Sequence, residues 1–324
     1  MELPEMKNSI DEEKGSEDQD GSMSSRSLTL ADGACWHIVP ENQEASAFVA
    51  WVAEVMQLSI YNGDGRKILI RIQDGDETNR ESLYRSETLK ALFTEALDDY
   101  PWEEECYPLK KDIPYHFCQY HDEILQTLQL IQFSNVIVFD AVTRGGMLLH
   151  GALIERDGLG IILAGPGGVG KTTACNRLPE PWQALSDDTT LIVRDGMGKY
   201  WAHPWPTWSQ FLVEKVGGRW ELGIGIELKA ICFLKQSDDT DMVPLGKGEM
   251  VCLSVECIEQ ANRALSRELE EGNYRKLSHL HFRNVCKMAD VVHGYRLCLD
   301  LKTHFWEFLD DALGVEVERV FDKR

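Results

Sequence analysis

Residues 159–173, LGIILAGPGGVGKTT, contain the stretch that decides the fold. Within it, Gly165-Pro166-Gly167-Gly168-Val169-Gly170-Lys171-Thr172-Thr173 fits the pattern G-x-x-x-x-G-K-[ST] of a phosphate-binding loop. The apolar run before the loop predicts a strand, and TTACNRL after the lysine is compatible with a helix. A strand that leads through such a loop into a helix predicts an α/β domain built around a sheet.

The loop carries the groups that bind nucleotide phosphates. Its glycines allow tight turns in which successive N–H groups face an anion, and the N-terminus of the following helix adds the positive end of its dipole. Lys171 would place its charge on the β- and γ-phosphates, and the Thr172 hydroxyl suits Mg²⁺. The candidate nucleotide-binding residues are Gly165, Gly167, Gly168, Val169, Gly170, Lys171, Thr172 and Thr173.

A pair of carboxylates follows the loop. Asp187 and Asp188 come 16 and 17 residues after Lys171, directly behind a short predicted strand at 182–186. Two carboxylates beside a phosphate loop can divide two tasks, since one can hold Mg²⁺ while the other accepts a proton from an attacking hydroxyl. An Asp pair in a chain with 54 acidic residues can also be a solvated turn. The position after a strand favours a site.

His150 ends the apolar strand before the loop, among Leu148, Leu149 and Ala152. A single histidine in such company is, taken alone, more often a core residue. The chain also lacks an N-K-x-D motif, which disfavours a GTPase.

Outside this region the chain divides into three parts. Residues 1–27 are acidic and rich in Ser and Gly, which predicts a disordered acidic tail. Residues 28–140 predict a small α/β domain with helices at 44–58, 86–98 and 117–132 and a strand at 67–73. Residues 141–324, after a break at Arg144-Gly145-Gly146, form the second predicted domain. Its predicted strands are 147–155, 159–165, 182–186, 189–194, 199–203 and 228–235, and its predicted helices are 255–270, 273–290 and 302–313.

Charge excludes some partners. The chain has 33 Lys and Arg against 54 Asp and Glu, a net charge of −21, which repels nucleic acid and anionic membranes. We find no apolar run near the roughly 20 residues of a spanning helix and no signal peptide at the start, so we expect a cytoplasmic protein. The nine cysteines are scattered without a C-x-x-C pair, which indicates reduced thiols and not a disulfide framework or zinc ribbon.

These motifs together resemble the HPr kinase/phosphorylase family and its phosphoenolpyruvate carboxykinase-like relatives. The resemblance rests on His150-Gly151-Ala152, on the loop about 15 residues later and on Asp187-Asp188, and it covers roughly 140–310. It implies an HPr-kinase-like P-loop domain with a mixed sheet. It implies that Lys171 and Thr172 hold ATP and Mg²⁺, that one of Asp187 and Asp188 is the base while the other assists the metal, and that His150 lines the same site. Which aspartate is the base stays open; the candidate metal ligands are Thr172 and Asp188.

The activity that the resemblance implies is ATP- and Mg²⁺-dependent phosphoryl transfer to a Ser or Thr hydroxyl of a small protein or a ribosomally made peptide. More narrowly, the chain resembles the HPr-kinase-like component of a peptide-modification cassette, which implies a radical SAM enzyme and a small precursor peptide as partners. The N-terminal region does not look like the usual HPr-kinase N-domain, and we do not find the C-terminal signature that engages HPr. HPr as acceptor and the phosphorylase activity are therefore not carried over.

Two other classes stay open. The chain could be a nucleotide-binding regulatory or assembly protein with little catalysis, or a small-molecule kinase, because the acceptor pocket and the oligomeric state leave no mark in the sequence. The loop 203–208, HPWPTW, is stiffened by two prolines and presents two indoles. It is equally compatible with a wall of the substrate site and with a packed loop that closes a hairpin.

Overall fold

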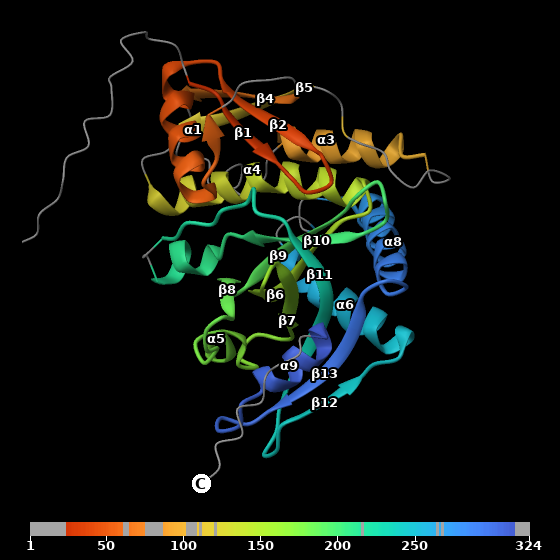
Figure 1. Cartoon of the computed structure of the whole chain (residues 1–324). Helices are drawn as coiled ribbons and strands as arrows, with labels where there is room; N and C mark the ends of the chain where they lie inside the picture. The colour runs from red at the N-terminus through yellow and green to blue at the C-terminus, as the bar shows by residue number, and fades with distance from the viewer. Residues whose placement is uncertain are drawn as a thin grey trace, which may run out of the picture.

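A computed structural model describes residues 24–60, 65–74, 87–101, 109, 112–119, 122–214, 217–263, 266 and 269–314. They form two mixed sheets with helices packed on both, one sheet above the other in Figure 1. The N-terminal sheet is at the top, and the sheet that carries the glycine-rich loop is below it. The expected α/β class with mixed sheets is confirmed.

The N-terminal sheet has five strands in the order β3-β1-β2-β4-β5. Strands β2, β4 and β5 run parallel up to one edge of the sheet, while β1 pairs antiparallel with both β2 and β3, and β3 forms the other edge. Asn42 caps the first helix, because its side chain accepts a hydrogen bond from the Ala45 amide at 3.3 Å. The elements are β1 (Arg26–Thr29), β2 (Cys35–Pro40), α1 (Gln43–Met56), β3 (Ser59–Ile60), β4 (Arg66–Asp74), α3 (Glu87–Asp98) and β5 (Asp112–Gln119). The predicted helices at 44–58 and 86–98 and the strand at 67–73 are confirmed, whereas of the predicted tail only 24–27 are described, and 26 and 27 belong to β1.

The predicted helix at 117–132 is wrong at both ends. Residues Asp112–Gln119 form β5, where Ile113 and Tyr115 alternate into the core beside β4. The helix α4 (Glu123–Thr143) begins after Asp122, whose carboxylate accepts from the amides of Ile124 and Leu125. The domain boundary predicted at 140/141 therefore falls inside a helix.

Helix α4 lies between the two sheets (Figure 1). Its residues Phe133 and Val136 share one core with Ile70 of the N-terminal sheet and with Leu148 and Leu191 of the other sheet. Contact on both sides makes the helix apolar around most of its surface. Among the described residues it is the one helix long and apolar enough to cross a membrane by length and composition, and 61% of that window is buried in the protein. This corrects the expectation that no such run exists.

The second sheet has eight strands, in the order β10-β9-β6-β7-β11-β13-β12 with β8 paired to β6. Strands β7, β11 and β13 are parallel, and the others pair antiparallel. The strands are β6 (Met147–Arg156), β7 (Leu159–Ala164), β8 (Gln183–Ser186), β9 (Thr189–Arg194), β10 (Tyr200–Trp205), β11 (Ile226–Gln236), β12 (Asp241–Pro244) and β13 (His293–Leu299). The six predicted strands are confirmed, but β12 and β13 were not predicted.

Helices cover both faces of this sheet, so its central strands are apolar on both sides. In β7, Ile162 and Ala164 face one core cluster together with α6 (Lys247–Ala261) and α8 (Glu271–Met288). Ile161 and Leu163 face the other, together with α5 (Lys171–Cys175) and α9 (Trp306–Leu313).

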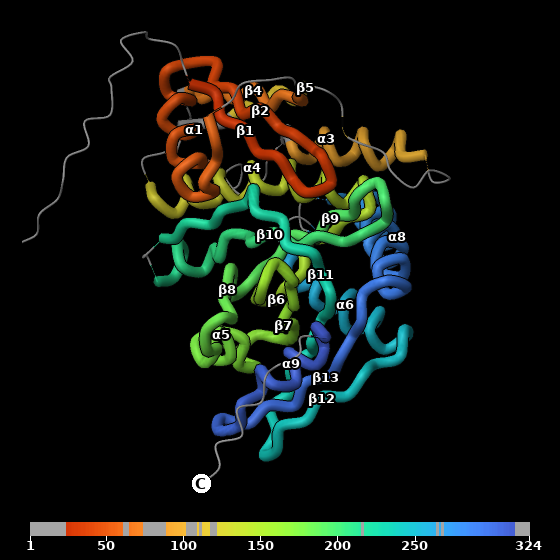
Figure 2. Tube along the Cα trace, viewed as in Figure 1, coloured from red at the N-terminus to blue at the C-terminus, as the bar shows by residue number. Residues whose placement is uncertain are grey.

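Two helix predictions in this half need correction. The helix predicted at 255–270 is displaced, because α6 begins at Lys247 and ends at Ala261, where the side chain of Asn262 donates to the carbonyls of Ile258 and Leu148. The helix predicted at 302–313 begins only at Trp306. After α8 the chain enters the sheet again as β13, which is drawn in blue in the trace of Figure 2.

Candidate functional site

The glycine-rich loop joins β7 to α5, as predicted. Gly165, Gly168 and Gly170 have φ angles of +147°, +78° and +108°, a region in which a side chain would be strained. The loop therefore needs glycine at these positions. Helix α5 is only five residues long, so the helix dipole that is expected at the loop from the sequence comes from a single turn.

Lys171 is buried beneath the loop with 6% of its surface exposed. Its Nζ lies 2.9 Å from the Gly165 carbonyl, 3.3 Å from the Pro166 carbonyl and 2.9 Å from His150 Nε2. Burial lowers the pKa of the ammonium group, and the nearby charge of Asp188 opposes that shift. The three donors of the ammonium group thus all meet neutral acceptors.

His150 connects Lys171 to Asp188. Burial, and then the charge of Lys171, lower the pKa of the imidazole, so the ring is neutral. Because Nε2 faces the Lys171 donor, we assign the ring proton to Nδ1, which points at Asp188 Oδ1 at 3.3 Å. The histidine is therefore part of the site and not an isolated core residue.

The two aspartates have different partners. Asp188 faces His150, while Asp187 Oδ1 accepts a hydrogen bond of 2.7 Å from the Thr207 hydroxyl. The charges of both carboxylates act on Lys171. Both belong to the turn between β8 and β9, which Ser186 stabilises by donating to the Thr189 carbonyl at 2.9 Å.

Two buried thiols flank the lysine. Burial raises the pKa of Cys175 to about 12 and that of Cys257 to about 11. Both remain protonated near neutral pH and add no charge to the site. Seven cysteines are free thiols in the structure, in line with the scattered spacing: Cys35, Cys175, Cys232, Cys252, Cys257, Cys286 and Cys298.

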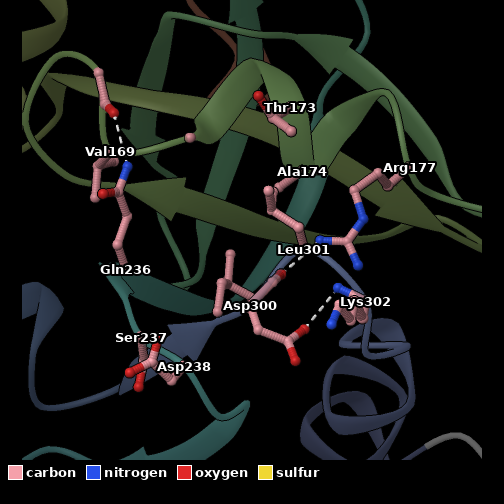
Figure 3. Close-up of a pocket in the computed structure, with 13 residues that line it drawn as sticks. Val169, Thr173, Ala174, Arg177, Gln236, Ser237, Asp238, Asp300, Leu301 and Lys302 are labelled. Atoms are coloured by element: carbon pink, nitrogen blue, oxygen red, sulfur yellow. Dashed lines mark hydrogen bonds between the residues drawn. The ribbon is translucent and has the colours of Figure 1, made fainter.

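A pocket of about 770 Å³ opens beside the loop, at the carboxyl ends of the parallel strands β7, β11 and β13 (Figure 3). Open α/β sheets bind ligands at this edge. Gln236 Nε2 donates to the Gly168 carbonyl at 3.1 Å, and Arg177 donates to the Asp300 carbonyl at 2.8 Å. Thr173 and Lys302 complete the wall.

The side chains of the candidate site fit a magnesium ion that is bound together with a nucleotide. No group of three or more His, Cys, Asp and Glu side chains within the described residues suits a metal on its own. Mg²⁺ is usually held by one or two protein oxygens together with waters and substrate phosphates. The exposed Thr172 hydroxyl and the partly exposed Asp188 carboxylate would supply such oxygens.

The structure thus brings together Lys171, His150, Asp187 and Asp188, all predicted from the sequence. Thr207, Arg177, Gln236 and Lys302 were not predicted as site residues. The HPWPTW stretch was noted for its prolines and indoles, but nothing in its spacing singles out the threonine. Gln236 ends β11, whereas Arg177 follows α5 and Lys302 follows β13, so only the order of the strands in the sheet brings these three residues together.

Fold and site define an α/β protein with a glycine-rich loop and a buried lysine at the carboxyl edge of parallel strands. A family model for the SynChlorMet cassette protein ScmC matches residues 116–314, more than half of the chain. The chain therefore belongs to this family. A search of curated proteins finds no match.

Proposed function

We propose that this protein is an ATP- and Mg²⁺-dependent kinase that phosphorylates a Ser or Thr hydroxyl on a small protein or a ribosomally made peptide. The observation that carries the proposal is the convergence of Lys171, His150, Asp187 and Asp188 at the end of β7. The resemblance of the same motifs to HPr kinases supports an HPr-kinase-like P-loop fold and this reaction.

The proposed roles follow from the contacts. Lys171 would exchange its neutral acceptors for phosphate oxygens, and the amides of the glycine loop would bind the same anion. Asp187 would accept the proton of the acceptor hydroxyl, while Asp188 and Thr172 would hold the metal. Bound Mg²⁺ would neutralise charge that develops on the transferred phosphoryl group. Catalysis would consist of positioning and charge stabilisation.

The pocket beside the loop supports a nucleotide as donor. It continues from the loop toward Arg177 and Lys302, so a ligand with its phosphates on the loop has space for a ribose and base there. Its volume of about 770 Å³ lies within the range of small-molecule sites.

The acceptor and the partners are proposed from charge and family. The net charge of −21 favours a neutral or basic acceptor over an acidic one. The family description as a cassette protein supports partners from the same cassette. The resemblance of the motifs implies that a precursor peptide and a radical SAM enzyme are among them. The buried thiols and the need for ATP support a cytoplasmic location.

One observation favours a second candidate. All three donors of Lys171 already have acceptors, so a nucleotide must rearrange the loop region in order to bind. A regulatory or assembly protein that changes shape with nucleotide and catalyses little would use that rearrangement directly.

Incubation with γ-labelled ATP and Mg²⁺, with and without peptides encoded beside the gene, tests the proposal. Label on a peptide supports the kinase, and label on a metabolite supports a small-molecule kinase. Free phosphate alone would indicate an ATPase. Tight nucleotide binding without labelled product or free phosphate would contradict the kinase and favour the regulatory protein.

A further inference from the structure

We infer that Thr207 is a positioning residue that orients Asp187, and that helix α1 of the N-terminal half supports it through a bridge of aromatic rings. The inference rests on the proposed function, because it assigns Asp187 the base role and asks what holds its carboxylate in place. Nothing in the family description assigns a role to Thr207 or to the N-terminal sheet.

The contact between the two side chains is short and shielded. Thr207 is 3% exposed, and its hydroxyl lies 2.7 Å from Asp187 Oδ1. An ionised carboxylate only accepts hydrogen bonds, so the threonine is the donor. With Oδ1 engaged, the rotation of the carboxylate is restricted and Oδ2 remains available for the acceptor hydroxyl.

The backbone around Thr207 is also held. The Thr189 hydroxyl donates to the Pro206 carbonyl at 3.1 Å, and Trp205 pairs with Thr189 in the ladder between β9 and β10. Thr189 directly follows the aspartate pair. The turn that carries Asp187 and the loop that carries Thr207 are therefore tied at two points.

Beyond Thr207 the chain packs on helix α1 of the N-terminal half. The Phe211 ring lies 6.0 Å from Trp208, 6.1 Å from Trp220 and 6.4 Å from Trp51 of α1, measured between ring centroids. The Trp220 amide also donates to the Val55 carbonyl of α1 at 2.8 Å. These contacts tie Phe211 and Trp220 to α1, so α1 forms part of the support of the site.

Steady-state phosphoryl transfer by the full chain tests the inference with Thr207→Val and Thr207→Ser. We expect Thr207→Val to lower kcat by about 10- to 100-fold while KM for MgATP changes less than about twofold. Thr207→Ser, which keeps the hydroxyl, should retain most of kcat. In an Asp187→Asn background, Thr207→Val should add almost no further loss, because the two residues act as one unit.

Thr127→Val is the matched control, since Thr127 is a buried threonine on α4 whose hydroxyl bonds the Glu123 carbonyl. Equal losses in the valine and serine variants, or a loss that appears in KM, would overturn the inference. Crystal structures of wild type and Thr207→Val give a second test that does not depend on catalytic activity. The Asp187 carboxylate should be rotated in the variant. If wild type transfers no phosphate, the proposed function fails, whereas an unmoved Asp187 in Thr207→Val removes the positioning role itself.

Discussion

Each half of the molecule buries a group of charged side chains, but the partners of these charges differ. In the N-terminal half, the fully buried Asp140 pairs with Arg66 and Arg144, and Arg144 also pairs with Asp32. In the other half, the buried ammonium group of Lys171 contacts one imidazole and two backbone carbonyls.

We interpret the first group as one that stabilises the fold and the second as one that can bind an anion. When a buried ion pair loses one partner, the remaining charge is left without compensation, which is costly. Such a group therefore stabilises the packing in which its charges are paired. A buried charge that meets only neutral dipoles can exchange them for an anion with a gain in attraction. The comparison predicts that substitutions in the first group reduce stability and substitutions in the second reduce activity.

Lys171→Ala should have the largest effect. We expect phosphoryl transfer to fall by about 10³-fold or more, because the main cation of the site is lost. The midpoint of thermal unfolding should change little, because the lost contacts are with neutral groups. Label transfer and calorimetry measure the two effects, and transfer near the wild-type rate would refute the site.

Asp140→Asn should show the opposite pattern. It leaves Arg66 without its anion and Arg144 with Asp32 alone, so the free energy of unfolding should fall by about 3 kcal/mol. Urea unfolding measures it, and nucleotide binding by the folded fraction should persist. Glu41→Gln, which breaks an exposed ion pair with Arg71, is the control and should cost less than about 1 kcal/mol. A larger loss of unfolding free energy in Glu41→Gln would contradict the distinction between buried and exposed ion pairs.

Acid should destabilise the protein through two buried neutral histidines. Burial lowers the pKa of His203 and of His281 to about 4. The unfolded chain takes up these protons near pH 6.5 while the folded protein does not, so stability falls as the pH drops from 6.5 toward 4. At pH 5 each histidine should cost about 2 kcal/mol relative to pH 7.

The variant His281→Phe removes one of the two histidines and so tests its share of the loss of stability in acid. His281 Nε2 has no hydrogen-bond partner, so an apolar ring should be tolerated there. Urea unfolding at several pH values should give a shallower acid dependence than wild type. An unchanged slope would mean that His281 is not a buried neutral group.

His150→Gln should have the smallest effect. It removes the imidazole that links Lys171 to Asp188 but leaves both charges in place, so we expect kcat to fall about tenfold. His293→Gln, an exposed histidine on β13, is the control and should leave kcat unchanged. A loss as large as that of Lys171→Ala would show that the imidazole itself takes part in the proton transfer.

Much of the site could be predicted because its signals are local. The glycines, Lys171 and Thr172 lie within eight residues, and the strand before them has a plain apolar pattern. The boundaries of α4 and α6 could not be predicted as well. The first residues of the predicted helix at 117–132 belong to a strand that is recognised only by its pairing with β4. The polar start of α6 has no apolar period, and its N-cap Gly246 makes no side-chain hydrogen bond.

The sequence by itself determined the glycine-rich loop between β7 and α5, because the loop needs particular residues at closely spaced backbone positions and no distant partner. It also determined that a lysine, a histidine and two aspartates were candidates for one site. Only the tertiary structure decided their partners. Thr207 contacts Asp187 because β9 and β10 return the chain to the same edge of the sheet, and Phe211, four residues after Thr207, packs on Trp51 of α1. Such contacts depend on how separate elements pack, and a hydroxyl or an indole gives no sign in sequence of the side chain that it will meet.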